Sequence, residues 1–240
     1  MNLVLDIGNT RVKAGVFNDN DGTLTESTDD VTSEHLRSIL NRLPIARAAI
    51  CSVRNGEPEW LNELSAIKVH RVTSSSKLPF TSRYATPETL GTDRICLVAG
   101  AATLHPGEDV LIVDAGSCIT YDFIDGSAVY HGGAISPGIM MRYKALNQFT
   151  GKLPLVTKMD KTKLTGDSTE ASIASGVLNG AIGEVEGMTS RYMTLHANLK
   201  TIITGGDAPY LLANLETRIF AAPNLVLYGL NSILNLNVAT

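Results

Sequence analysis

The sequence predicts an α/β protein built from two similar halves that face each other across a cleft. The run LVLDIG begins at Leu3 and the run LIVDAG begins at Leu111, so each half opens with an apolar strand that ends in Asp-x-Gly. Each run then continues through a β-rich segment to an Asp-Gly turn, at Asp21 and at Asp125. A single Asp-x-Gly after a strand is common. Two of them in the same register indicate a duplicated domain.

The elements expected in the first half are a meander of three strands, a helix, a strand, a short helix and a strand. Their predicted ranges are Leu3–Leu5, Val12–Phe17, Thr23–Thr25, a helix capped by Thr32 or Ser33 and stopped by Pro44, Ala48–Val53, Pro58–Ile67 and Lys68–Val72. The order β-β-β-α-β-α-β is that of a ribonuclease-H-like domain. We therefore expect two such domains in tandem, residues 1–107 and 108–240.

The segment Thr73–Thr92 is polar and rich in turn residues, so it is either a linker or a loop over a pocket. The nearly all-apolar helix Ile95–Leu104 follows and must be buried on most of its circumference. Its N-terminus would hold Asp93 and Arg94 rigidly. Asp93 is then either a functional carboxylate or only a helix cap, with Arg94 as its partner.

The second half repeats the meander and then alternates loops, helices and strands. Its predicted elements are strands Asp109–Asp114, Ser117–Ile124 and Ala128–His131, a glycine-rich loop at 132–138, helices Ile139–Phe149 and Thr169–His196, strand Lys200–Thr204, a turn at 205–208, strand Leu225–Leu227 and helix Gly229–Leu236. Glycine inside a helix is costly unless another backbone packs closely. Gly176, Gly180 and Gly183 therefore predict close helix packing, within the chain or between subunits.

Composition excludes several classes of protein. The net charge is −4 without a basic cluster, which argues against nucleic acid as a partner. The 3 cysteines are widely spaced, so neither a disulfide framework nor a zinc site is indicated. The longest apolar run, near Ile95–Thr103, is too short to span a membrane, and the N-terminal residues do not resemble a secretory signal. We expect a soluble, cytoplasmic protein.

The two Asp-x-Gly turns have the chemistry of a phosphate site. Asp6 is followed by backbone N–H groups, hydroxyls and cations up to Lys13, a combination that suits a phosphate and its metal ion. Asp6 and Asp114 on facing hairpins would repel each other and a triphosphate, so a cation is required between them. Asp93 belongs to neither turn and is free to act as a base on an acceptor alcohol.

Motifs spread along the chain carry a family resemblance. They are DIGNT at 6–10, GTDR at 91–94, DAGSCITYD at 114–122, GGAISPG at 132–138 and TGGDA at 204–208. In this order the chain resembles the type III pantothenate kinases of the acetate and sugar kinase/Hsp70/actin superfamily. The resemblance implies an actin-like ATPase duplication and ATP-dependent phosphorylation of the primary hydroxyl of pantothenate, the first step towards coenzyme A.

The resemblance also implies roles for individual residues and a homodimer. Asp93 would be the proton acceptor, Asp114 would hold a monovalent cation, K⁺ or NH₄⁺, and Asp6 would hold Mg²⁺ directly or through water. ATP would contact Asp6, Ile7, Gly8, Asn9, Thr10, Arg11, Val12, Lys13 and Ser117. Pantothenate would contact Tyr84, Gly91, Thr92, Asp93, Arg94 and Thr169, the last in its own or the neighbouring subunit's site. Ser117 and Cys118 stand where the family usually has Thr and Ala; serine keeps the hydroxyl.

Other functions compete with this interpretation. Proteins of the Bvg accessory factor type, described as transcriptional accessory proteins, keep the same motifs, so a non-enzymatic regulator is one alternative. Another small-molecule kinase of the superfamily is a second, and a plain interaction protein is a third. The presence of Asp6, Asp93 and Asp114 together favours an enzyme.

Overall fold

A computed structural model describes residues 1–54, 56–157, 160 and 162–238. The chain forms two compact units, each made of segments that are distant in sequence. Unit 1 contains Met1–Gly107, Ile124–Gly132 and Asn224–Thr240, and unit 2 contains Glu108–Phe123 and Gly133–Pro223. These units group residues by contact, whereas the predicted domains divide the chain by its duplication, so the boundaries 1–107 and 108–240 stay a prediction.

Unit 1 is organised on a five-stranded sheet in the order β3-β2-β1-β4-β5. Its strands are β1 (Asn2–Ile7), β2 (Val12–Phe17), β3 (Leu24–Asp29), β4 (Arg47–Ser52) and β5 (Lys68–Arg71). The meander β1-β2-β3 is antiparallel, whereas β1, β4 and β5 run parallel. The predicted first half is confirmed in its order of elements.

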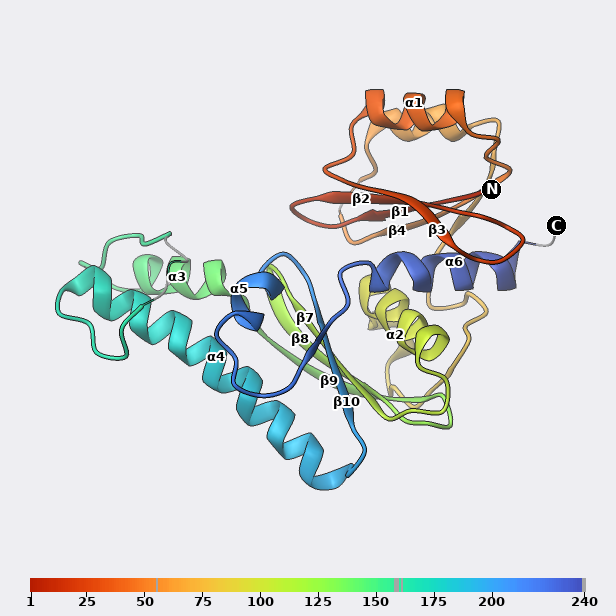
Figure 1. Ribbon diagram of the computed structural model, residues 1–240. Coiled ribbons are helices and arrows are strands. Elements are labelled where there is room, and N and C mark those ends of the chain that lie inside the picture. The colour runs from red at the N-terminus through yellow and green to blue at the C-terminus, as the bar shows by residue number, and fades with distance from the viewer. Residues whose placement is uncertain (55, 158–159, 161, 239–240) are drawn as a thin grey trace. The chain divides into compact units, whose positions relative to one another are not determined.

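Helices cover both faces of this sheet (Figure 1). Leu3, Leu5 and Ile7 of β1 pack in one core with α1 (Ser33–Arg42) and the 3₁₀ helix η1 (Glu59–Leu64). Because side chains alternate along a strand, Asn2 and Asp6 belong to the opposite face, where α6 (Leu225–Asn237) lies. Thr32, one of the two caps expected from the sequence, is the N-cap of α1 and forms a capping box with His35.

Helix α2 (Thr92–Leu104) packs against α6 so closely that glycine is required at the crossing. A Cβ on Gly229 would collide with the carbonyl oxygen of Cys96, and one on Gly100 would collide with that of Leu225. The close helix packing in unit 1 is therefore between α2 and α6. The glycines predicted to serve this purpose lie in α4. Among the described residues, a Cβ on Gly176 or Gly183 would meet nothing within 4 Å, and one on Gly180 would meet only the Arg142 guanidinium at 4.0 Å.

The second sheet repeats the strand order of the first. It contains β7 (Val110–Ala115), β8 (Cys118–Ile124), β9 (Val129–Pro137), β10 (Lys200–Thr204) and β11 (Phe220–Ala221), with the two-residue strand β6 (Thr81–Ser82) beside β9. Read from β9, the order is β9-β8-β7-β10-β11, which matches β3-β2-β1-β4-β5 element for element. The duplication predicted from the two Asp-x-Gly turns is thus present in the topology.

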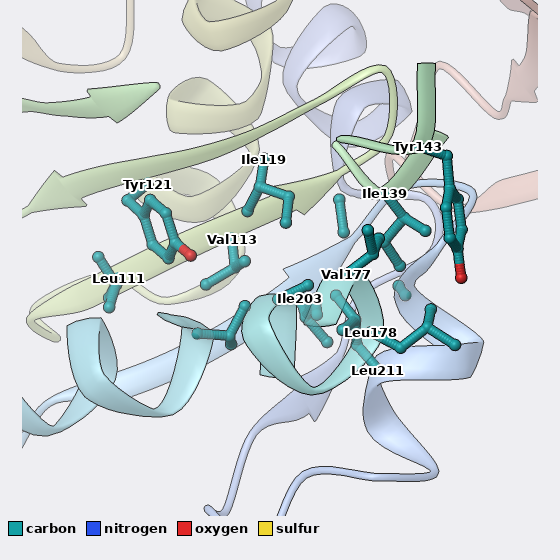
Figure 2. Packing of buried hydrophobic residues seen from close by; sticks show 14 of the residues in the cluster. Leu111, Val113, Ile119, Tyr121, Ile139, Tyr143, Val177, Leu178, Ile203 and Leu211 are labelled. Carbon is teal, nitrogen blue, oxygen red and sulfur yellow. The ribbon is translucent and has the colours of Figure 1, made fainter. Parts of the chain in front are cut away.

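The core of unit 2 lies on one face of this sheet (Figure 2). Leu111 and Val113 of β7 pack with Ile119 and Tyr121 of β8 against three helices, and all four of these side chains are buried. The helices are α3 (Ile139–Gln148), α4 (Thr169–Leu195) and α5 (Ala208–Leu212). By alternation, Asp114 belongs to the face of β7 opposite this core, as Asp6 does in β1.

Two predicted elements are wrong, and both involve short apolar or glycine-rich runs. The predicted loop at 132–138 is mostly strand, because β9 continues to Pro137. Gly133 lies so close to the carbonyl of Tyr121 that only glycine fits, so it permits close strand approach instead of breaking the strand. The predicted strand Leu225–Leu227 is the first turn of α6, since a short apolar run does not distinguish a strand from a buried helix.

The segment Thr73–Thr92 is ordered by contacts of its own. It contributes β6 and the 3₁₀ helix η2 (Pro87–Thr89), and Phe80 is buried against Tyr130 with ring centroids 6.0 Å apart. It is therefore not a flexible linker. Among the residues described, no helix is long and apolar enough to cross a membrane.

Candidate active site

The candidate site in unit 1 forms where β1, β4 and α2 meet. Asp6 pairs in register with Cys51 of the neighbouring parallel strand. The hydroxyl of Thr92, the first residue of α2, donates to the carbonyl of Ser52 at 3.2 Å and accepts from the Cys51 thiol at 3.4 Å. These contacts fix the start of α2 to the end of β4, beside the strand that carries Asp6.

The start of α2 holds Asp93 in one orientation. Gly91 is the N-cap, and one oxygen of Asp93 accepts a hydrogen bond from the backbone N–H of Arg94 at 2.8 Å. A side chain at Gly91 would collide with that same carboxylate oxygen. A carboxylate in the first turn also gains from the positive end of the helix. The glycine of GTDR therefore makes room for its aspartate.

Asp6 and Asp93 influence each other electrostatically. Burial, and then the negative charge of Asp93, raise the pKa of Asp6 to about 7, while Lys13 acts in the opposite direction. Two carboxyl groups in a half-buried site cannot both ionise without cost. The repulsion between Asp6 and Asp114 expected from the sequence stays a prediction; within unit 1 the carboxylate whose charge acts on Asp6 is Asp93.

This acid pair suits a divalent cation. A cation beside Asp6 would take the place of the proton that the raised pKa keeps there. No set of three His, Cys, Asp or Glu residues that could hold a metal exists in the described part of the chain. Mg²⁺ usually takes one or two protein carboxylates and completes its octahedron with water and substrate phosphates. The residues around Asp6 therefore fit Mg²⁺ that is bound together with a nucleotide.

The rest of the 6–13 segment divides into buried and exposed residues. The side chains of Ile7 and Val12 are in the core, so only their backbone atoms can touch a ligand. Asn9, Thr10 and Arg11 are exposed. Lys13 Nζ lies 3.2 Å from Asp29, and Arg11 lies 3.9 Å from Asp30. The carbonyl of Gly8 accepts from Arg54, a contact that the sequence analysis missed.

Arg94 is buried in an aromatic site. It is 5% exposed, its Nη2 donates to the hydroxyl of Tyr130 at 2.9 Å, and its guanidinium lies 5.5 Å from the ring centre of Tyr84. The rings of Tyr84 and Tyr130 stack at 6.1 Å and 14°. Tyr84 and Arg94, both predicted substrate contacts, are therefore neighbours. Tyr130 was missed, since its only signal in the sequence is a place in an ordinary strand.

The candidate site in unit 2 is built around Asp114 at the end of β7. Gly205 has a φ of +96°, and a Cβ there would lie 2.5 Å from Asp114 Oδ1 and would collide with the carbonyl of Ala115. That carbonyl accepts from the N–H of Asp207 at 2.9 Å. The TGGDA motif therefore packs its backbone directly against the aspartate, as only glycine allows.

Gly138 of the GGAISPG motif packs against the turn at Gly116 and Ser117, which follows Asp114. Gly138 donates its N–H to the carbonyl of Ser117 at 3.2 Å, and a side chain on Gly138 would collide with Gly116 and Ser117. Ser117 is exposed at the turn. Thr169 is exposed at the first position of α4, next to the cap Ser168. Three of the sequence motifs thus meet in unit 2, and the other two meet in unit 1.

Comparisons with known proteins agree on one family. The family model described as type III pantothenate kinase matches residues 2–191. The type III pantothenate kinase of Christiangramia forsetii is 44% identical over 242 residues, which cover 99% of each chain. That of Cytophaga hutchinsonii is 42% identical over 240 residues, which cover 99% of this chain and 100% of the other.

Solved structures show the fold. A Campylobacter jejuni protein described as a "conserved putative Baf family transcriptional activator" has a TM-score of 0.62 and 22% identity, with 96% of each chain covered. A glucokinase from an Antarctic psychrotroph has a TM-score of 0.52 and 12% identity, with 97% of this chain and 98% of that one covered. At such identities the likeness concerns the fold alone. The predicted fold, two ribonuclease-H-like halves of the actin-like type, is confirmed.

Proposed function

The chain belongs to the type III pantothenate kinase family, and we propose that it transfers the γ-phosphoryl group of ATP to the primary hydroxyl of pantothenate, giving 4'-phosphopantothenate. The observation that carries the proposal is the pair Asp6 and Asp93, because it supplies both needs of such a reaction. Phosphoryl transfer requires charge neutralisation at the phosphates and a base beside the acceptor alcohol.

Asp6 serves the phosphate side of the reaction. Mg²⁺, when bound with the nucleotide, would supply charge neutralisation at the phosphates. Asp6 would hold the cation in its ionised form, directly or through water. Backbone N–H groups of Gly8 to Thr10 and the cation Arg11 lie in the adjacent turn, and Lys13 follows in β2; these groups would orient the phosphates. Ser117 is proposed as a further ATP contact through its hydroxyl.

Asp93 serves the alcohol side. Its carboxylate is held by the N–H of Arg94 and by the space at Gly91. Positioned within hydrogen-bond reach of the pantothenate hydroxyl, it accepts the proton as the bond to phosphorus forms. A carboxylate is a weak base, so the proton moves late, when the alcohol has become more acidic.

Arg94 and Tyr84 select the acceptor. Pantothenate carries a carboxylate, which a guanidinium can bind through two parallel hydrogen bonds. Burial against Tyr84 and the hydroxyl of Tyr130 leaves Arg94 few orientations. Gly91 and Thr92, at the start of α2, belong to the same proposed pantothenate site. Thr169 is proposed as a further pantothenate contact, in its own or the neighbouring subunit's site.

Two further parts of the proposal concern Asp114 and the oligomer. We infer that Asp114 binds a monovalent cation, K⁺ or NH₄⁺, beside the carbonyl of Ala115 and the backbone of Gly205. We also infer a cytoplasmic homodimer. Gly176 and Gly183 support a homodimer because they leave an exposed strip on α4 that a second helix can approach closely.

One coupled assay tests the function. ATP turnover is measured with and without pantothenate, in K⁺ and in Na⁺. We expect turnover to depend on pantothenate and to fall when Na⁺ replaces K⁺. Turnover that ignores pantothenate would contradict the kinase assignment, whereas equal rates in both salts would contradict only the cation site at Asp114.

The transcriptional alternative has weaker support. The Campylobacter structure is named as a transcriptional activator, but at 22% identity it shows the fold alone. A regulator without catalysis also has no chemical reason to keep two mutually repelling carboxyl groups half-buried.

A further inference from the structure

Unit 1 contains a groove that none of the family motifs lines. Its volume is about 720 Å³. One wall comes from α6, another from Leu78–Thr81, and the C-terminal end of α2 contributes Thr103 and Leu104. The tips of the hairpins β2–β3 and β8–β9 complete it with Asp21 and Ala128 among others. The groove is thus at the end of α2 opposite to Asp93.

Most of the groove is apolar. Leu78, Pro79, Phe80, Leu104 and Leu236 line it, and Phe80 is 7% exposed. Such walls favour an aliphatic or aromatic body.

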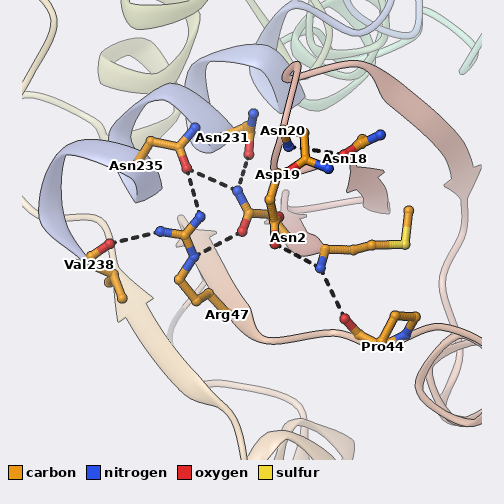
Figure 3. A network of polar contacts seen from close by, with 10 residues as sticks. Asn2, Asn18, Asp19, Asn20, Pro44, Arg47, Asn231, Asn235 and Val238 are labelled. Carbon is orange, nitrogen blue, oxygen red and sulfur yellow. Dashed lines mark hydrogen bonds and ion pairs between the residues drawn. The ribbon is translucent and has the colours of Figure 1, made fainter. Parts of the chain in front are cut away.

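The polar part of the groove is a fixed network around Asn2 (Figure 3). Arg47 Nε donates to the carboxamide oxygen of Asn2 at 3.1 Å, and its Nη2 donates to Asn235 Oδ1 at 3.2 Å. Asn2 Nδ2 donates to Asn231 Oδ1 at 2.8 Å and to Asn235 Oδ1 at 3.0 Å. Asn2 itself is fully buried.

Arg47 sets the direction of every carboxamide in this network. A guanidinium only donates, so it must face the oxygen of Asn2. The nitrogen of Asn2 then faces Asn231 and Asn235, which must present their oxygens to it. The NH₂ groups of Asn231 and Asn235 therefore point away from Asn2, as Figure 3 shows. The positions of oxygen and nitrogen in all three asparagine side chains therefore follow from the fact that arginine only donates hydrogen bonds.

These amide groups are unused donors. Asn231 is 6% exposed, and its Nδ2 has no hydrogen-bond partner in the described part of the chain. The buried side-chain atoms without partners in that part are Thr120 Oγ1 and Thr189 Oγ1, so Asn231 Nδ2 is not sealed off by protein. Both Asn231 and Asn235 line the groove. A donor on a nine-tenths buried side chain that opens into an apolar groove can donate to an acceptor placed there.

The charges nearby favour an uncharged acceptor. The carboxylate of Asp21 lines the groove and accepts from the N–H of Thr23 at 2.9 Å. Its negative charge opposes an anionic ligand. The positive charge of Arg47 lies behind the asparagines, where it polarises their amides without reaching the groove wall.

We propose that this groove binds a small uncharged molecule that places a carbonyl oxygen, of an ester or an amide, between Asn231 and Asn235 and its short apolar body against Leu78, Phe80 and Leu104. The lining residues of this groove include none of the residues proposed for ATP, metal or pantothenate.

Titration of the full-length protein with methyl hexanoate tests the proposal. The side-chain amide signals of ¹⁵N-labelled protein are followed, with hexanoate and hexylamine as the charged acceptor and the donor-only cation of similar length. For so small a molecule we expect a dissociation constant of roughly 1–10 mM for the ester. The signals of Asn231 and Asn235 should shift and saturate with the ester, and the other two probes should bind more weakly.

Isosteric variants complete the test. Asn235→Asp and Asn231→Asp each replace the amide donor by an acceptor at constant volume and keep an oxygen for Asn2. Each should weaken ester binding at least about tenfold, whereas Asn62→Asp, on the exposed side of η1, should not. Asn235 is exposed, so that variant keeps the fold even if Asn231→Asp does not. Ester binding unchanged in Asn235→Asp, no shift of either amide signal, or tighter binding of hexanoate or hexylamine would overturn the proposal.

Discussion

Two half-buried carboxyl groups, Asp6 in unit 1 and Glu184 in unit 2, have pKa values that are shifted in opposite directions. Burial and the charge of Asp93 raise the pKa of Asp6 to about 7. Burial acts in the same direction on Glu184, but hydrogen bonds from Arg142, Tyr121 and Ser136 outweigh it and hold the pKa of that carboxyl below its ordinary value. Tyr121 and Ser136 donate at 2.9 Å each.

The difference separates a structural acid from a functional one. Glu184 is fully satisfied by the chain and joins β8, β9, α3 and α4 in unit 2. Asp6 lies near another acid, Asp93, so its ionised form is unfavourable in the folded protein unless a bound cation neutralises the charge. Strained or destabilised groups of this kind concentrate at functional sites. The predictions below follow from this contrast.

The largest effect is expected for Asp93→Asn. The amide keeps the size of the side chain but cannot accept the proton of the alcohol. Steady-state kinetics should show a kcat lower by roughly a hundredfold or more, with ATP binding largely intact. Glu88→Gln, in the exposed 3₁₀ helix η2, is the matched control. A nearly unchanged kcat would remove Asp93 from the mechanism.

Asp6→Asn should lower the affinity for Mg²⁺–ATP and, in the same variant, raise the stability of the metal-free protein. The affinity for Mg²⁺–ATP should fall about tenfold or more, because the cation loses its carboxylate. Because the pKa of Asp6 is raised above its ordinary 3.8, its contribution to stability is full below that pH and is lost as the pH rises through about 7. The variant should therefore unfold at a higher temperature than the parent at pH 8, and this difference should narrow steadily as the pH falls towards 3.8.

Thermal unfolding without metal checks the second part. At this chain length each kcal/mol corresponds to roughly 2–4 °C. Glu59→Gln, exposed on η1, controls for the loss of one negative charge. If Asp6→Asn lowers the melting temperature at pH 8, ionised Asp6 stabilises the fold as Glu184 does, which would contradict the proposed difference between the two carboxyl groups.

Glu184→Gln should have the opposite pH dependence. The stability from a lowered pKa is present above the ordinary value of 4.5 and is lost as the pH falls through the lowered pKa. The variant should be less stable by about 1 kcal/mol at pH 7, since charge-assisted hydrogen bonds become neutral ones. Denaturant unfolding should show this difference closing as the pH falls below 4.5 and through the lowered pKa. Asp167→Asn, whose ion pair with Lys163 is exposed, should change little at either pH.

The smallest effect is expected for Tyr130→Phe. Arg94 loses one acceptor but keeps the ring of Tyr84 beside it. The KM for pantothenate should rise roughly threefold to tenfold while kcat changes less. A hydrogen bond from a charged group is worth about 1.5–3 kcal/mol, and only part of this is lost from substrate binding because Tyr130 orients Arg94 without touching the substrate. Tyr210→Phe in unit 2 serves as the control. An unchanged KM would mean that Tyr130 does not position Arg94.

The sequence predicted the features that local chemistry decides. The strand before Asp6, the cap at Thr32 and the glycine turns at Asp21 and Asp125 all follow from residues close to each other along the chain. The repeated strand order followed because both halves carry the same local signals.

Features that depend on distant residues were missed. Tyr130 reaches Arg94 from 36 positions along the chain, and nothing in its own strand marks it. The proximity of Asp93 to Asp6 depends on the hydrogen bond between Thr92 and Ser52, which no periodicity reveals. The predicted strand Leu225–Leu227 was wrong for a different reason. These three apolar residues are buried against α2, and a buried apolar run this short suits a helix as well as a strand.

The division of the chain into units has a practical consequence for dissecting the protein. The backbone passes from one unit to the other four times, at 107/108, 123/124, 132/133 and 223/224. A fragment ending at Gly107 would retain Asp6, Asp93 and Arg94 but would lack Tyr130 and the whole of α6. Genetic complementation with separately expressed halves therefore requires a cut inside an exposed turn of one unit, and not at the point where the sequence repeat begins.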